Sequence, residues 1–162
     1  MSSKSSSRHI YETVTIHLNN IMNEIITEPN IGKRFLAGFV DYTIIYGVTI
    51  FLTFTYGEPN DMGEYSLSGL LGLIPIVFWL IMTVGLETGF GATLGNLLVG
   101  LKPVPISGTN RKLTFGESFK RHLLDPIDMF FFGLIGIVTI KNTNKNQRVG
   151  DIWARTIVVQ NK

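Results

Sequence analysis

Two long apolar stretches with almost no charge constrain this chain more than any other feature. Residues 35–56 hold one charged residue, Asp41, in 22 positions, and residues 67–86 hold none in 20. At about 1.5 Å per residue, each stretch is about 30 Å long as a helix, which matches the hydrocarbon thickness of a bilayer. The sequence therefore predicts two full transmembrane helices and excludes an ordinary soluble domain.

A third apolar region, residues 114–140, is less regular. Its first half contains a set of charged residues and a proline: Lys120, Arg121, Asp125, Pro126 and Asp128. The region either crosses the membrane once or forms a helical hairpin broken near residues 126–128. Residues 97–106 and 153–160 have the composition of short strands. We expect an all-α membrane protein, a small polytopic helical bundle with two short cytoplasmic strands.

The first 30 residues differ from the rest of the chain. Residues 1–7 are serine-rich and are predicted to be disordered, because they cannot offset their own ordering entropy. Apolar residues spaced three or four apart predict an amphipathic helix over residues 8–27: Ile10, Val14, Leu18, Ile21 and Ile25. Residues 31–162 then form the transmembrane domain. We expect its first helix to be an uncleaved anchor, because the first apolar run begins only at Phe35.

The distribution of Lys and Arg predicts the topology. Four precede the first apolar stretch, none lies between the two stretches, five lie in residues 102–121 and five in residues 141–162. The positive-inside rule places the N-terminus and residues 87–121 in the cytoplasm of a multi-pass cell-membrane protein. A single third crossing would leave five positive charges outside. We favour the hairpin, which returns the C-terminus to the cytoplasm and lets the two strands pair.

Composition excludes several classes of function. A net charge of +2 with no basic stripe disfavours nucleic-acid binding, and the absence of cysteine excludes disulfides and thiolate metal sites. The histidines lack metal-ligand spacing, so no metal is expected. The glycine-rich segment 89–95 follows an apolar helix rather than a strand and lacks GK[ST], which disfavours a nucleotide cofactor. No cofactor is expected, and without a nucleophile motif the chain is predicted not to be an enzyme.

Asp41 is the residue whose position most needs an explanation. An ionised aspartate in mid-helix costs roughly 2.5 to 3.5 kcal/mol on insertion scales, so we expect it to face the bundle interior and to pair with a cation. Arg34 lies two helical turns earlier on nearly the same face, and Arg121 and Arg148 are further candidates. Such a cluster is either a static ion-pair network or part of a transport or proton pathway.

Four segments of the chain match one family pattern. They are GKRFLAGFVDYTIIYGV, ETGFGATLGNLLVGLKPV, LTFGESFKRHLLDPID and NQRVGDIWARTIVV, and in this order they make residues 32–160 resemble the RDD family of integral membrane proteins. The arginine and two aspartates of the family's name fall on Arg34, Asp41 and Asp151. Further matching positions are Thr93, Gly95, Gly100, Arg121, Arg148 and Thr156. Asn96 departs from the pattern, which commonly has lysine there. The resemblance implies a polytopic protein of a family suggested to act in transport, mostly without an assigned substrate.

Two functional hypotheses follow. The first is a small carrier or cation/proton exchanger in which Asp41 binds a monovalent cation or a proton. The second is a non-catalytic membrane subunit or scaffold that recruits a partner protein. Two spans are few for a carrier unless it forms a homo-oligomer, whereas a mere anchor has no need of Asp41. The lipid bilayer is an expected partner in either case. The candidate binding or transport residues are Arg34, Asp41, Asp151, Arg121, Arg148, Asp128 and Glu87.

Overall fold

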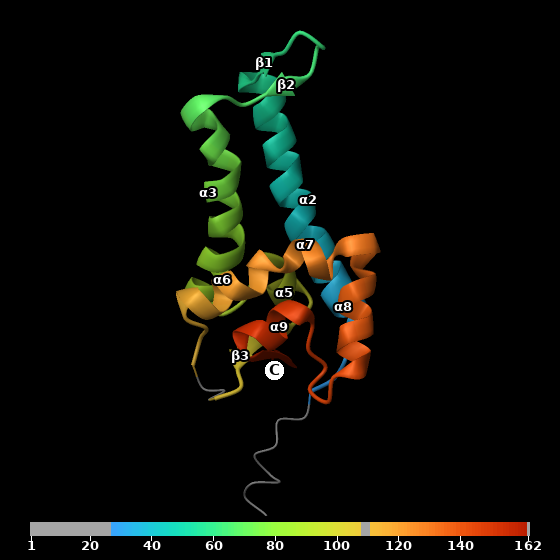
Figure 1. Ribbon diagram of the computed structural model, residues 1–162. Coiled ribbons are helices and arrows are strands. Elements are labelled where there is room, and N and C mark those ends of the chain that lie inside the picture. Colours follow the sequence, from blue (N-terminus) through green and yellow to red (C-terminus); the bar gives the residue numbers. More distant parts are fainter. Residues whose placement is uncertain (1–26, 108–110, 162) are drawn as a thin grey trace, which may run out of the picture.

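The computed structural model describes residues 27–107 and 111–161 of the chain. The predicted disordered start and almost all of the predicted amphipathic helix lie outside these residues. Two tall helical columns rise from a broader base made of short helices and strands (Figure 1). The base contains the candidate site, so the fold is described from the columns downward.

The first column is α2 (Ile31–Tyr56), a helix of 26 residues. It begins earlier than the apolar stretch, so Arg34 lies in its first turn. Only Ala37, Asp41 and Ile45 are buried in it. These three residues are spaced by four and form one stripe along the helix, which is the face that packs on the rest of the protein. The other faces expose aromatic and aliphatic side chains, as a bilayer requires.

The second column is a continuous helical stretch over residues 69–90 that changes its winding along its length. It consists of the 3-10 helix η1 (Gly69–Leu73), the α-helix α3 (Ile74–Leu80), the π-helix η2 (Ile81–Gly85) and the α-helix α4 (Leu86–Phe90). Pro75 lies at the start of α3, where its missing N–H costs little. Both columns are long and apolar enough to cross a membrane, which confirms the two predicted spans.

The two columns are joined at the end farthest from the base. There β1 (Glu58–Pro59) and β2 (Tyr65–Ser66) pair as a short antiparallel hairpin. At the opposite end, β3 (Leu101–Pro105) pairs antiparallel with β4 (Thr156–Gln160), with Pro103 opposite Val158. Three central side chains of this second pair, those of Leu101, Val104 and Ile157, are buried and form part of the small apolar core.

The third apolar region is bent rather than straight. It forms α6 (Phe115–Leu123), α7 (Asp125–Asp128) and α8 (Phe130–Asn142). The axis turns by 113° between residues 115–128 and 133–142, where the sequence places a break. α6 and α7 run across the base, and α8 descends beside the lower part of α2 (Figure 1). Whether the region counts as a broken span or as a re-entrant hairpin stays a prediction.

The remaining short helices complete the base. α5 (Leu94–Leu98) packs against α2, and α9 (Val149–Ala154) packs against α6. In both contacts a glycine lets the two helix backbones approach closely. A Cβ at Gly95 would overlap the carbonyl group of Ala37, and a Cβ at Gly150 would overlap the carbonyl group of Arg121. Gln160 donates a hydrogen bond to Glu28 at 2.7 Å, so the end of β4 lies beside the start of α2. The cytoplasmic location of this end stays a prediction.

Candidate functional site: a buried charge cluster

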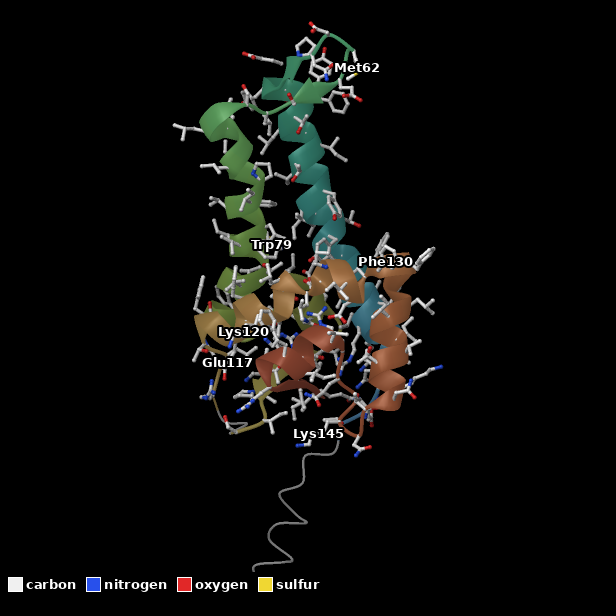
Figure 2. The ribbon with its side chains drawn as sticks, viewed as in Figure 1. Met62, Trp79, Glu117, Lys120, Phe130 and Lys145 are labelled. Carbon is white, nitrogen blue, oxygen red and sulfur yellow. The ribbon has the colours of Figure 1, made fainter. Side chains whose placement is uncertain are left out.

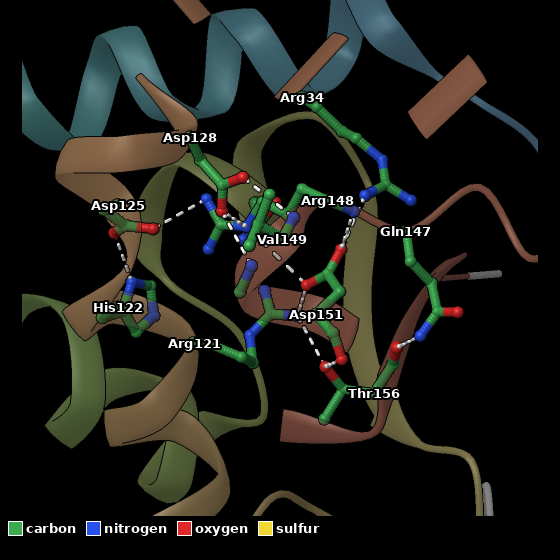
Figure 3. A network of polar contacts seen from close by, with 12 residues as sticks. Arg34, Arg121, His122, Asp125, Asp128, Gln147, Arg148, Val149, Asp151 and Thr156 are labelled. Carbon is green, nitrogen blue, oxygen red and sulfur yellow. Dashed lines mark hydrogen bonds and ion pairs between the residues drawn. The ribbon is translucent and has the colours of Figure 1, made fainter. Parts of the chain in front are cut away.

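A cluster of charged side chains fills the centre of the base, where an apolar core would be expected (Figure 3). Its members come from α2, α4, α6, α7 and the segment around α9. We call this set the charge cluster; it consists of Arg34, Asp41, Glu87, Arg121, His122, Asp125, Asp128, Arg148 and Asp151. Seven of the nine residues are buried, and Arg34 and Arg148 are partly buried.

Asp151 is the centre of the arginine side of the cluster. Its side chain is fully buried on α9 and pairs with the Arg121 and Arg34 guanidinium groups, the latter at 3.1 Å. It also accepts a hydrogen bond from the backbone N–H of Arg148 at 3.2 Å. Burial raises the pKa of the Asp151 carboxyl, but the arginine charges outweigh this effect and hold the pKa below its ordinary value. Asp151 is therefore ionised under ordinary conditions.

Arg121 joins α6 to three other elements. Its guanidinium contacts Asp151, donates to the Thr156 hydroxyl on β4 at 3.2 Å, and places Nε 3.3 Å from Glu87 on α4. The side chain is 2% exposed. A buried arginine with one missing partner is costly, so each of these contacts constrains where its element can lie.

Arg148 lies beside the two carboxylates of α7. Its guanidinium lies 2.8 Å from Asp125 and 3.7 Å from Asp128. Burial lowers the pKa of Arg148, but the surrounding carboxylates reverse this effect and raise the pKa above its ordinary value. Asp128 is also held by the backbone N–H groups of Val149 and Gly150, at 2.9 and 3.0 Å. The start of α9 is thus fixed to α7 as well as to α6.

His122 extends the cluster toward α2 and α4. Its Nδ1 lies 2.8 Å from Asp125, whose carboxylate also accepts a hydrogen bond from the Tyr42 hydroxyl at 2.7 Å. The other ring nitrogen lies 3.5 Å from Glu87, which in turn accepts a hydrogen bond from Ser118 at 2.6 Å. Hydrogen bonds therefore link Tyr42, Asp125 and His122, and a longer ion-pair contact brings Glu87 beside them.

Asp41 differs from the other carboxylates of the cluster. It is 5% exposed and accepts a 2.7 Å hydrogen bond from the backbone N–H of Gly95 on α5. Among the described residues, no Lys, Arg or His lies within 4 Å of its carboxylate. The predicted ion pair of Asp41 with Arg34, Arg121 or Arg148 is therefore wrong. Asp41 does not need a cation as its partner, because the close approach of Gly95 to α2 supplies a backbone N–H donor instead.

The cluster carries more negative than positive groups. Five carboxylates face three guanidinium groups and one imidazole. Even when His122 is charged, one carboxylate has no matching positive charge among the described residues. Burying an unmatched charge is expensive, so neutralising one carboxylate lowers the electrostatic cost of the cluster. Asp41 is the carboxylate without a cationic neighbour.

A small polar cavity lies beside Asp41. Its volume is about 70 Å³, and its walls include the side chains of Asp41, His122, Asp125 and Thr93. A cavity of this size has room for a few water molecules, since each needs only about 10 to 15 Å³ of this kind of space. No group of three or more His, Cys, Asp or Glu side chains in the described ranges has a geometry suited to a metal ion.

The structure brings all seven predicted site residues into one cluster. Sequence reasoning missed four contributors: Tyr42, Ser118, His122 and Asp125. The three-residue spacing of His122 and Asp125 on one helical region was the available indication, because such pairs lie side by side. The Arg34–Asp151 pair joins residues 117 positions apart, and it is not among the pairs predicted from the sequence.

The comparison with protein families decides the chain's affiliation. A model of the RDD family matches residues 28–155, which include every member of the charge cluster. The chain belongs to the RDD family. The arginine and the two aspartates that give this RDD protein its family name lie in the cluster as an Arg34–Asp151 pair and a separately held Asp41. No curated protein and no solved structure matches the chain.

Proposed function

We propose that this RDD family membrane protein exchanges protons or monovalent cations across the membrane, with Asp41 as the group that binds and releases them. The observation that carries the proposal is the state of Asp41: a buried carboxylate with one backbone donor, no cationic neighbour among the described residues, and a polar cavity beside it. A carboxylate in such surroundings can trade a proton for a cation at little structural cost.

The rest of the charge cluster supports this role because the charge of Asp151 and its arginines stays constant. Asp151 is matched by arginines, so its charge does not need to change when Asp41 is loaded. The hydrogen-bonded groups of Tyr42, Asp125 and His122 line the same cavity as Asp41, so they give a proton acceptors and donors beside it. In this proposal Arg34 and Asp151 set the electrostatic background, while Asp41 titrates. No covalent chemistry is involved, and the protein is not an enzyme.

The test is gradient-driven flux in proteoliposomes. Purified full-length protein is reconstituted with an internal pH-sensitive dye, and Na⁺, K⁺ or Li⁺ gradients are applied. We expect the wild type to exceed empty liposomes with at least one cation, and Asp41→Asn to fall to the level of empty liposomes. The amide keeps the shape and still accepts the Gly95 hydrogen bond, but it cannot titrate.

The matched control is Asp61→Asn. Asp61 is an exposed aspartate in the turn between β1 and β2, far along the chain from the cluster. This variant loses one carboxylate but should keep wild-type flux. Wild-type flux equal to that of empty liposomes under all three gradients would reject the exchanger and favour the scaffold hypothesis. Asp41→Asn flux equal to wild type would reject Asp41 as the titrating group.

A further inference from the structure

A large apolar groove lies on the outside of the protein between α2 and α8. Its volume is about 870 Å³, and its walls include Phe35, Phe39 and Ile50 from α2 and Ile137 and Ile140 from α8. This volume lies in the upper part of the range for small-molecule sites, and it is an order of magnitude larger than the polar cavity. Its walls are almost entirely hydrocarbon, so its occupant has to be apolar where it touches them.

Glycines keep the groove open. Gly47 on α2 and Gly133 and Gly136 on α8 line it, and a Cβ added at Gly47 would meet no heavy atom within 4 Å. Gly32, in the first turn of the same helix, also has open space around it but does not line the groove. Both helical glycines have open space for a side chain, but only Gly47 lines the groove.

The base end of the groove is positively charged. α2 begins there at Ile31 and α8 ends there at Asn142, and Ile31 and Ile140 both line the groove. Lys33 and Lys141 are exposed at this end. Lys145 also lies at the bottom of the molecule, whereas Phe130 marks the other end of α8 (Figure 2).

The described acids that line the groove or lie at its base end are already engaged. Glu28 accepts the hydrogen bond from Gln160, and Asp128, which lines the inner wall, is held by two backbone N–H groups and by Arg148. The exposed lysines are therefore available to an anionic group at the level where the helices leave the hydrocarbon.

We infer that the groove binds one acyl chain of an anionic phospholipid, whose phosphate lies against Lys33 and Lys141. A lipid fits better than a peptide because the groove opens between two helices whose outer faces expose apolar side chains. Phe39 is 61% exposed on α2, and Phe130 is 57% exposed on α8. These faces lie in the acyl region of a bilayer, where the abundant apolar ligand is lipid.

The groove also borders the polar cavity. Arg34, Gly38, Tyr42, Met129 and Arg148 line both spaces. The partition is thin, because the methyl carbon of Met129 lies 3.0 Å from where a Cβ on Gly38 would be. A bound acyl chain covers this wall from the outside and keeps the charge cluster separated from the bilayer. This inference does not depend on the proposed ion exchange.

The test is native mass spectrometry of the full-length protein with phosphatidylglycerol or phosphatidylcholine added at equal concentration. We expect the wild type to retain one phosphatidylglycerol in preference to phosphatidylcholine. Gly47→Leu should reduce retention by about tenfold, because excluding roughly two methylene groups of the chain has that effect. Gly32→Leu, which makes the same change on the same helix outside the groove, should retain lipid like the wild type.

A second pair of variants tests the headgroup. Lys33→Gln and Lys141→Gln should each lower the preference for phosphatidylglycerol by about fivefold. Lys120→Gln, which removes an exposed lysine on α6 rather than at the base ends of α2 and α8, should leave it unchanged. Equal lipid retention by Gly47→Leu and Gly32→Leu would overturn the site. Equal wild-type binding of both lipids would overturn the anionic preference, and a protein dimer lost only in Gly47→Leu would assign the groove to a second copy of the chain.

Discussion

Asp151 and Asp41 are both buried aspartates of the charge cluster, but they are held in different ways. Asp151 pairs with Arg34 and Arg121 and joins helices from three parts of the chain. Asp41 is held by one backbone N–H and faces a cavity. The first arrangement fixes a charge, and the second leaves a charge free to be neutralised. Two aspartates of one family pattern can therefore have a structural role and a functional role, respectively.

The largest effect on stability should come from removing Asp151, the aspartate that is paired with arginines. Asp151→Ala leaves the partly buried Arg34 without a carboxylate and the buried Arg121 with Glu87 alone, which should cost about 3 to 5 kcal/mol of stability. We expect a strong loss of folded yield and a lower melting temperature in detergent, measured by size-exclusion chromatography and a thermal scan. Asp61→Ala, at an exposed position, is the control. A melting temperature unchanged from wild type would mean that the ion pairs do not hold the base together.

A smaller effect should follow from separating α2 and α5. In Gly95→Ala the new methyl group overlaps the carbonyl group of Ala37, so the two helices must move apart and the donor to Asp41 is displaced. Overpacking of this kind should cost about 1 to 3 kcal/mol. The readout is the melting temperature together with cation flux. Gly89→Ala, where an added Cβ meets nothing within 4 Å, should change neither; equal behaviour of the two variants would contradict the close contact.

The smallest effect on stability is expected for Asp41→Asn. The amide oxygen still accepts the Gly95 hydrogen bond, and no buried cation loses its partner, so the change should stay below about 1 kcal/mol. The measurement is the same thermal scan used for Asp151→Ala. A loss as large as that of Asp151→Ala would show that Asp41 has a fixed charge, and the contrast between the two aspartates would disappear.

The general architecture could be predicted because the bilayer restricts it so strongly. Runs of about 20 uncharged apolar residues have few alternatives to a spanning helix, and the two columns follow from composition alone. The bend in the third apolar region could be placed because Asp125, Pro126 and Asp128 interrupt its hydrophobic pattern. These predictions needed no knowledge of which residues meet in space.

The partners inside the site could not be predicted in the same way. The donor to Asp41 is a backbone N–H, which every residue except proline carries, so no side-chain pattern points to Gly95. The rule that a buried carboxylate pairs with a cation gave the wrong partner for Asp41. Asp151 does pair with arginines, but that these include Arg34, 117 residues earlier, depends on how α2 and α9 meet, which no local sequence pattern indicates.

The Arg34–Asp151 pair also has a consequence for how the protein is made. Arg34 precedes its partner by 117 residues, which at about 5 to 20 residues per second means a delay of roughly 6 to 23 s during synthesis. Until Asp151 has been made, Arg34 lacks this partner, and its long side chain has to keep its charge at the aqueous boundary. A chain that ends before Asp151 therefore contains both long apolar helices but lacks the carboxylate that ties α2 and α6 to α9.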